Sequence, residues 1–178
     1  MIAGLDAPMH GEGCSAELFA EAHRAALKAA CAEDPDIWAI YANNFGPDGF
    51  DASIDLYRSS RRNRTFVLFD GGELAGMSSF LGLDEPRHTL EIGGTYYRPQ
   101  LRGTGFNRRI KDMMLGRAFT CGLRRVEFRV DARNARSQAA MKKLGAVREG
   151  LLRADRITWT GHIRDTVLFA ILRNEWPV

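Results

Sequence analysis

The chain has 178 residues, of which 45% are hydrophobic and 26% are charged, and its formal net charge is +3. These values are typical of a globular protein with a sizeable core. They exclude the concentrated basic surface that non-specific nucleic-acid binding requires, and no apolar segment is long enough to span a membrane.

The cysteines and histidines predict neither a metal site nor a disulfide framework. Cys14, Cys31 and Cys121 are widely spaced, and no CxxC pair exists. Free thiols fit a reducing compartment, and Met1 to Gly13 carry no signal-peptide pattern, so we expect a cytoplasmic protein. Because no repeat or linker interrupts the chain, residues 1–178 are predicted to form a single domain.

The first part of the chain predicts helices after one short strand at Cys14 to Leu18. The alanine-rich segment from Glu21 to Glu33 favours a helix. Asp34-Pro35 is typical of the start of a second short helix, because Asp caps helices and Pro suits the first helical position. A loop from Asn43 to Gly49 then leads into a third helix, roughly Phe50 to Arg58.

From residue 65 the pattern changes to strands. Thr65 to Phe69 is β-branched and aromatic, Asp70-Gly71-Gly72 is a hairpin turn, and Leu74 to Leu81 forms the return strand. His88 to Tyr97 predicts a third, longer strand. Within it, Gly93-Gly94 is typical of a bulge or of the close approach of a ligand.

The last part of the chain combines two helices with three strands. Phe106 to Thr120 has apolar residues at helical spacing, and Arg125 to Val130 alternates as a strand does. A helix begins after Asn134, a predicted N-cap, and runs to Leu144, before a closing hairpin of two strands (147–157 and 163–172). The order predicts an α+β fold with a single mixed, mostly antiparallel sheet and helices on both faces.

The most informative stretch connects the third strand to the best helix. It reads Gln100-Leu101-Arg102-Gly103-Thr104-Gly105 and continues into Phe106 and Asn107. The start of a helix presents unpaired N–H groups and the positive end of its dipole, and glycines allow an anion close to the backbone. The stretch therefore predicts a phosphate site, with Arg102 and Arg108 as nearby charges.

The kind of phosphate site is narrowed by exclusion. A Walker loop needs Gly-Lys followed by Ser or Thr, and a dinucleotide fingerprint needs a third glycine at the position of Arg108. Neither pattern is present. Taken alone, the two glycines are equally consistent with a tight strand-to-helix connection.

Together with its surroundings, this stretch resembles the GNAT superfamily of N-acetyltransferases. Gln100 to Gly105 satisfies every fixed position of the family's pyrophosphate-binding signature, and Asn134 to Ala146 looks like its second motif. Further strings are similar to the branch that contains the ribosomal-protein N-terminal acetyltransferases of the RimJ/RimL type. They are Asp34 to Trp38, Gly103 to Asn107, Asp131 to Asn134, Leu144 to Gly150 and Arg164 to Val167.

The resemblance implies a fold and a cofactor. Two neighbouring parallel strands, here Leu90 to Tyr97 and Arg125 to Val130, splay apart, and the pantetheine arm of coenzyme A enters the gap. The residues implied for binding acetyl-CoA are Thr95, Gln100, Leu101, Arg102, Gly103, Thr104, Gly105, Phe106, Asn107 and Asn134. Of these, Thr95 or a neighbour would offer a backbone N–H to the thioester carbonyl. No metal is implied.

The chemistry requires removal of a proton from the amine and protonation of the departing thiolate. Glu91, on the splayed strand, is the candidate base; it could equally be a solvated or paired carboxylate. Many family members have a Tyr at the position that matches Met141, and Met cannot donate a proton. Ser137, one turn earlier, is therefore the candidate acid, although it could simply satisfy the first turn of its helix.

The sequence thus predicts an acetyltransferase that uses acetyl-CoA and a primary amine, either a protein N-terminus or a small molecule. The alternative is a non-catalytic module that binds coenzyme A as a sensor or scaffold. Aromatics such as Trp38, Tyr41 and Phe45 are more often core than pocket residues, but the resemblance places this region over the active site and so makes them candidate walls of the acceptor site. The basic stretch 58–64 lacks the stacking aromatics of an RNA-binding module, so no nucleic-acid or membrane partner is expected. An edge strand in the closing hairpin could support a homodimer.

Overall fold

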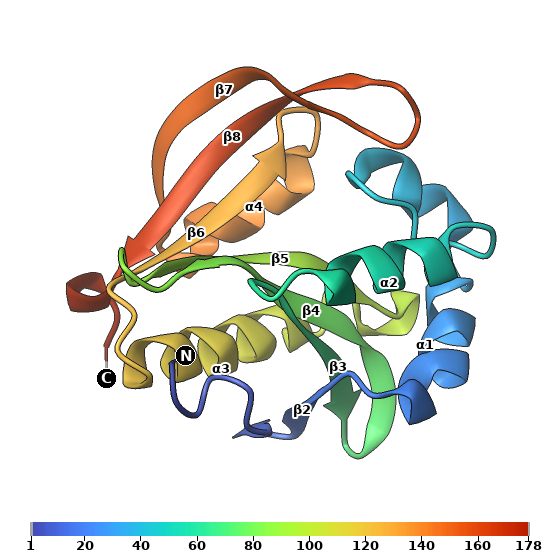
Figure 1. The fold of residues 1–178 in the computed structure, drawn as a ribbon, viewed down its shortest axis with the longest axis horizontal. Helices are drawn as coiled ribbons and strands as arrows, with labels where there is room; N and C mark the ends of the chain where they lie inside the picture. Colours follow the sequence, from blue (N-terminus) through green and yellow to red (C-terminus); the bar gives the residue numbers. More distant parts are fainter. Residues whose placement is uncertain (1, 178) are drawn as a thin grey trace.

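The structure, a computed structural model, describes residues 2–177 and contains one eight-stranded sheet in the order β1-β2-β3-β4-β5-β6-β8-β7 (Figure 1). Only β5 and β6 pair in parallel; the other neighbours are antiparallel. The strands are β1 (Met9–Gly11), β2 (Cys14–Leu18), β3 (Arg64–Asp70), β4 (Glu73–Asp84), β5 (Thr89–Tyr97), β6 (Arg125–Asp131), β7 (Val147–Ile157) and β8 (Ile163–Leu172). The predicted mixed, mostly antiparallel sheet is confirmed.

Helices cover both faces of this sheet, as predicted. The α-helices are α1 (Arg24–Cys31), α2 (Phe50–Ser59), α3 (Phe106–Thr120) and α4 (Ala135–Leu144). The 3₁₀ helices are η1 (Glu21–His23), η2 (Pro35–Ile40), η3 (Pro99–Leu101) and η4 (Arg173–Glu175). None of the helices within residues 2–177 is long and apolar enough to cross a bilayer.

Two hydrophobic cores lie on the two faces of the sheet. One packs α3 and α4 against the strands, and the other packs α1, η2 and α2. Successive side chains of β3 point to opposite faces of the sheet and so contribute to both cores. Phe66 and Leu68 belong to the first core, and Val67 belongs to the second. In Figure 1, α3 lies below the strands, whereas α1 and α2 lie at the end where β5 and β6 separate.

The N-terminal part departs from the sequence prediction in three places. The segment from Glu21 to Glu33 is not one helix but η1 followed by α1, and β1 was not predicted. Asp34 precedes η2 without capping it. Its carboxylate instead lies 2.6 Å from Arg102 Nη1. A charge-assisted ion pair therefore takes the place of the cap and connects the start of η2 to the predicted phosphate loop.

The C-terminal hairpin forms the far edge of the sheet. β8 pairs with β6 along Arg125 to Asp131, and β7 lies outside it as the edge strand. Val147 and Leu151 of β7 keep about half of their surface exposed, at 52% and 45%. This exposed edge is the feature on which the predicted homodimer depends; the dimer stays a prediction.

Candidate active site

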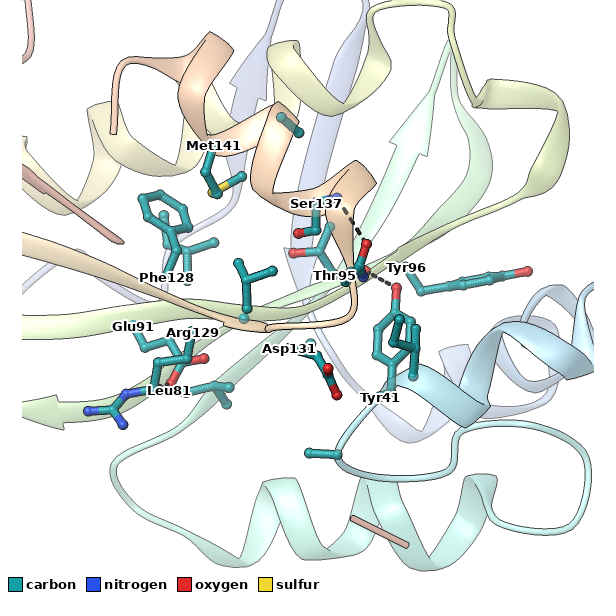
Figure 2. Close-up of a pocket in the computed structure, with 18 of the residues that line it drawn as sticks. Tyr41, Leu81, Glu91, Thr95, Tyr96, Phe128, Arg129, Asp131, Ser137 and Met141 are labelled. Carbon is teal, nitrogen blue, oxygen red and sulfur yellow. Dashed lines mark hydrogen bonds and ion pairs between the residues drawn. The ribbon is translucent and has the colours of Figure 1, made fainter. Parts of the chain in front are cut away.

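The centre of the sheet opens where β5 and β6 part. Their parallel pairing includes only Thr89, Leu90 and Glu91 on β5, although both strands continue beyond it. A cavity of about 190 Å³ lies in the opening. Figure 1 shows the two strands diverging toward α2, and Figure 2 shows the side chains of the cavity. The predicted splayed strand pair is confirmed.

A bulge in β5 lies at the start of this opening. The register between β4 and β5 shifts between Met77 and Ser79, opposite Gly94 and Thr95. Gly94 has a φ of +57°, and a Cβ on Gly93 would lie 2.6 Å from Glu91 Oε1. The glycine pair therefore forms the predicted bulge and leaves the space that the Glu91 carboxylate occupies.

The predicted phosphate loop presents bare backbone. Gly103 and Gly105 have φ values of +81° and +87°, and no atom lies within 4 Å of a Cβ built on either glycine. Within residues 2–177, the N–H groups of Gly103, Gly105 and Asn107 donate to no acceptor. Three free donors at the start of α3 fit an anionic diphosphate, which is the group that coenzyme A would place there.

The side chains around this loop have different roles. Phe106 is completely buried and Leu101 packs against the same core, so only their backbone faces outward. Arg102 lines the cavity, and its Nη2 atom is buried without a hydrogen-bond partner. Gln100 and Thr104 are exposed. Arg108 binds the Asp112 carboxylate at 2.8 Å, so its charge is already paired.

Asn134 caps α4, as predicted. Its Oδ1 atom accepts a hydrogen bond of 2.9 Å from the backbone N–H of Ser137, which places Ser137 at the third position of the helix. Ser137 and Met141 both line the cavity, and Figure 2 shows them on the same helix above the strands. The structure thus brings the two residues predicted for this helix, Asn134 and Ser137, to the opening.

Removal of this cap should destabilise the protein measurably. Asn134→Ala leaves the first turn of α4 without its acceptor, and we expect a loss of about 1 kcal/mol in the free energy of unfolding. Denaturant titration measures the loss, and Asn134→Asp, which keeps an acceptor oxygen, is the control. Equal stability of the alanine variant and the wild type would contradict the role of the cap.

Glu91 lies on the wall of the cavity beside several arginines. Its side chain is 19% exposed, and its Oε2 atom is 3.8 Å from Arg129 Nε. Burial raises the pKa of Glu91 above its ordinary value, and Arg156, Arg129 and Arg164 act in the opposite sense. A carboxylate whose pKa is raised in this way is a stronger base than an ordinary glutamate and is suited to accept a proton.

Changing the charge beside Glu91 should shift its titration. Arg129→Gln removes a nearby positive charge that favours the carboxylate, so the pKa of Glu91 should rise further. If Glu91 is the base, the acid limb of the pH–rate profile should move to higher pH. A limb that stays in place would show that another group controls it.

Lys111 is the feature that sequence reasoning missed. It lies on α3, lines the cavity and is only 4% exposed. Its Nζ atom donates to Thr95 Oγ1 at 2.7 Å. Burial lowers the pKa of Lys111 to about 7, against an opposing effect of Glu91. The available signal was its position, directly after Ile110 on the apolar stripe of the helix.

At the end away from the predicted phosphate loop, the cavity is lined by residues of η2 and of the C-terminal hairpin. Tyr41 and Phe45 line the cavity, and the Tyr41 hydroxyl donates to the Thr95 carbonyl at 2.6 Å. Trp38 is completely buried in the second core and does not reach the cavity, so its interpretation as an acceptor wall was wrong. Trp159, in the turn after β7, donates through Nε1 to the Trp38 carbonyl at 2.8 Å and so joins the C-terminal hairpin to η2.

Comparison with known proteins gives the same family. The model of the acetyltransferase (GNAT) domain matches residues 17–147, which is more than half of the chain. A search of the curated proteins found no match. No group of three metal-binding side chains occurs within residues 2–177.

Solved structures match almost the full chain. A probable acetyltransferase of the GNAT family from Chromobacterium violaceum has 28% identity and a TM-score of 0.89, over 96% of this chain and 88% of that one. A GCN5-related N-acetyltransferase from Brucella melitensis has 25% identity and a TM-score of 0.86, over 97% and 81%.

RimJ of Mycobacterium smegmatis, solved with CoA-disulfide, shares the fold at 21% identity and a TM-score of 0.80, over 96% of this chain and 88% of that one. The splayed strands, the glycine loop and the match to the family model all indicate the same family. The chain therefore belongs to the GNAT family of acetyltransferases, whose reaction is the transfer of an acetyl group from acetyl-CoA to an amine.

Proposed function

We propose that this protein acetylates a primary amine, either a protein N-terminus or a small molecule, by direct attack of the amine on the thioester of acetyl-CoA. One observation supports this most strongly. A single cavity is lined by Arg102, Asn107 and Asn134 beside the phosphate loop and also by Glu91. A cofactor held at one end can therefore present its thioester to an amine that the other end deprotonates.

The proposed binding site uses backbone more than side chains. The free N–H groups between Gly103 and Asn107 would hold the pyrophosphate, and the pantetheine arm would follow β5 past Thr95. A backbone N–H of Thr95 or a neighbour would polarise the thioester carbonyl. Glu91 would take the proton of the amine, directly or through one water.

The direct test is release of free thiol from acetyl-CoA, followed with a panel of small primary amines and of peptides that differ in their first residues. We expect turnover with at least one acceptor and a mass increase of one acetyl group on its amine. A protein that binds coenzyme A but acetylates none of these acceptors would instead favour the sensor or scaffold function.

A further inference from the structure

Lys111 occupies an unusual position for a charged side chain. It projects from α3 into the opening between β5 and β6, and it touches both strands. Its Nζ atom lies 2.7 Å from Thr95 Oγ1 on β5 and 5.7 Å from the centre of the Phe128 ring on β6. The amine is therefore held in the gap itself and not on the surface of the helix.

Nothing in the surrounding structure neutralises this amine. Among residues 2–177, no carboxylate lies within ion-pair distance of Lys111 Nζ, and its hydrogen-bond partner is a neutral hydroxyl that also bonds to Ser78 Oγ at 2.7 Å. A buried, unpaired lysine is costly for the stability of the fold. A functional role would account for its presence in the cavity.

The same cavity lacks the proton donor that the family commonly supplies from α4. Met141, which is 4% exposed, stands where many members have a Tyr, and its thioether carries no proton. Ser137 reaches the cavity from the same helix, but a serine hydroxyl gives up a proton far less readily than an ammonium. Lys111 is the cationic donor that the two splayed strands enclose.

We propose that Lys111 protonates the sulfur of coenzyme A as the thiolate leaves. The inference rests on the proposed acetyl transfer. The C–N bond forms and the C–S bond breaks, and the electron pair of the C–S bond stays on sulfur, which takes a proton from the Lys111 ammonium. The acceptor ammonium loses two protons in becoming an amide. One of them restores Lys111, through Glu91 or water, and the other goes to solvent.

The charges around Lys111 suit this step. Its lowered pKa, about 7, lies below the value of about 8.5 for an alkyl thiol, so transfer of the proton to the thiolate is favourable. Glu91 on β5 is the charged group that opposes the effect of burial. The other charged side chains along the cavity are Arg102, Arg129, Asp131, Arg136, Arg156 and Arg164.

The first test compares Lys111→Met with Ser137→Ala. Met is apolar and of similar length, so the melting temperature should not fall, and the Kd for acetyl-CoA should stay within about threefold. We expect kcat of Lys111→Met to fall about 100-fold, and the alkaline limb of its pH–rate profile to disappear. Lys142→Met, which changes an exposed lysine of α4 outside the cavity lining, is the matched control and should keep kcat. A Ser137→Ala variant that is inactive beside a Lys111→Met variant that is active would overturn the proposal.

The second test does not depend on turnover. The ultraviolet absorbance of the thiolate gives the pKa of the coenzyme A thiol in its complex with the enzyme. An adjacent ammonium stabilises the thiolate, so this pKa should be at least about one unit lower in wild type than in Lys111→Met. Equal values would overturn the proposal even if no acceptor had been identified. Lys111→Arg is the second variant: it keeps the charge but cannot release a proton near pH 7, so its kcat should remain low.

Discussion

Replacement of Glu91 by glutamine is expected to lower kcat by about 10²–10⁴-fold while leaving the affinity for acetyl-CoA nearly unchanged. The amide has almost the same shape as the carboxylate, but it cannot accept a proton from the amine. Above its raised pKa the wild-type carboxylate is charged and active, so the wild-type rate should climb with pH through that value. The variant should lack this acid limb, so its loss relative to wild type should be greatest above the pKa of Glu91 and smallest at low pH, where the wild-type carboxylate is itself protonated.

Glu127 provides the matched control for this experiment. It lies opposite Glu91 in the parallel register of β5 and β6, and Arg125 binds its carboxylate at 3.0 Å. Glu127→Gln makes the same chemical change one strand away, so kcat should stay close to wild type. Because the charge of Glu127 raises the pKa of Glu91, the acid limb should move slightly to lower pH. Unchanged pH–rate profiles for both variants would remove Glu91 from the mechanism.

Substitution of Gly105 by valine is expected to weaken the binding of coenzyme A strongly. The branched side chain would project into the open space over the loop, where the pyrophosphate would lie. Loss of one charge-assisted hydrogen bond costs about 1.5–3 kcal/mol, which corresponds to roughly 10- to 150-fold in Kd. Isothermal calorimetry measures this change directly.

Backbone strain has to be separated from lost binding, because Gly105 has a positive φ. Gly122, at the other end of α3, has a φ of +90° and equally open surroundings. Gly122→Val should therefore cost a similar strain energy, about 1–3 kcal/mol, and lower the melting temperature about as much as Gly105→Val does. It should leave the Kd for coenzyme A unchanged. If Gly105→Val binds coenzyme A as tightly as Gly122→Val, the pyrophosphate site lies elsewhere.

Local patterns predicted the regular elements and the loop well. The Gly103 to Asn107 turn, the Asn134 cap and the bulge at Gly93-Gly94 depend on short-range backbone geometry, which residue type largely determines. Amphipathic periodicity located α3 and its buried face for the same reason.

Features that depend on long-range packing were missed. The apolar stripe of α3 places Lys111 beside buried residues, but it does not show that a charged amine can be accommodated there. Only the gap between β5 and β6 provides room and a partner for that amine. The pairing of Asp34 with Arg102 likewise joins two loops that are far apart in the sequence. The burial of Trp38 depends on a core that α1 and α2 complete.

The contact between Trp159 and Trp38 can form only late in the synthesis of the chain. It joins residues 121 positions apart. Arg156 and Arg164 of the same hairpin line the cavity. The Gly103 to Asn107 loop and α3 leave the ribosome well before β7 and β8, which form the last two strands at one edge of the sheet. The nascent chain therefore contains the glycine loop and α3 before the hairpin residues that line the other side of the cavity exist, and the cavity wall is completed only near the end of synthesis.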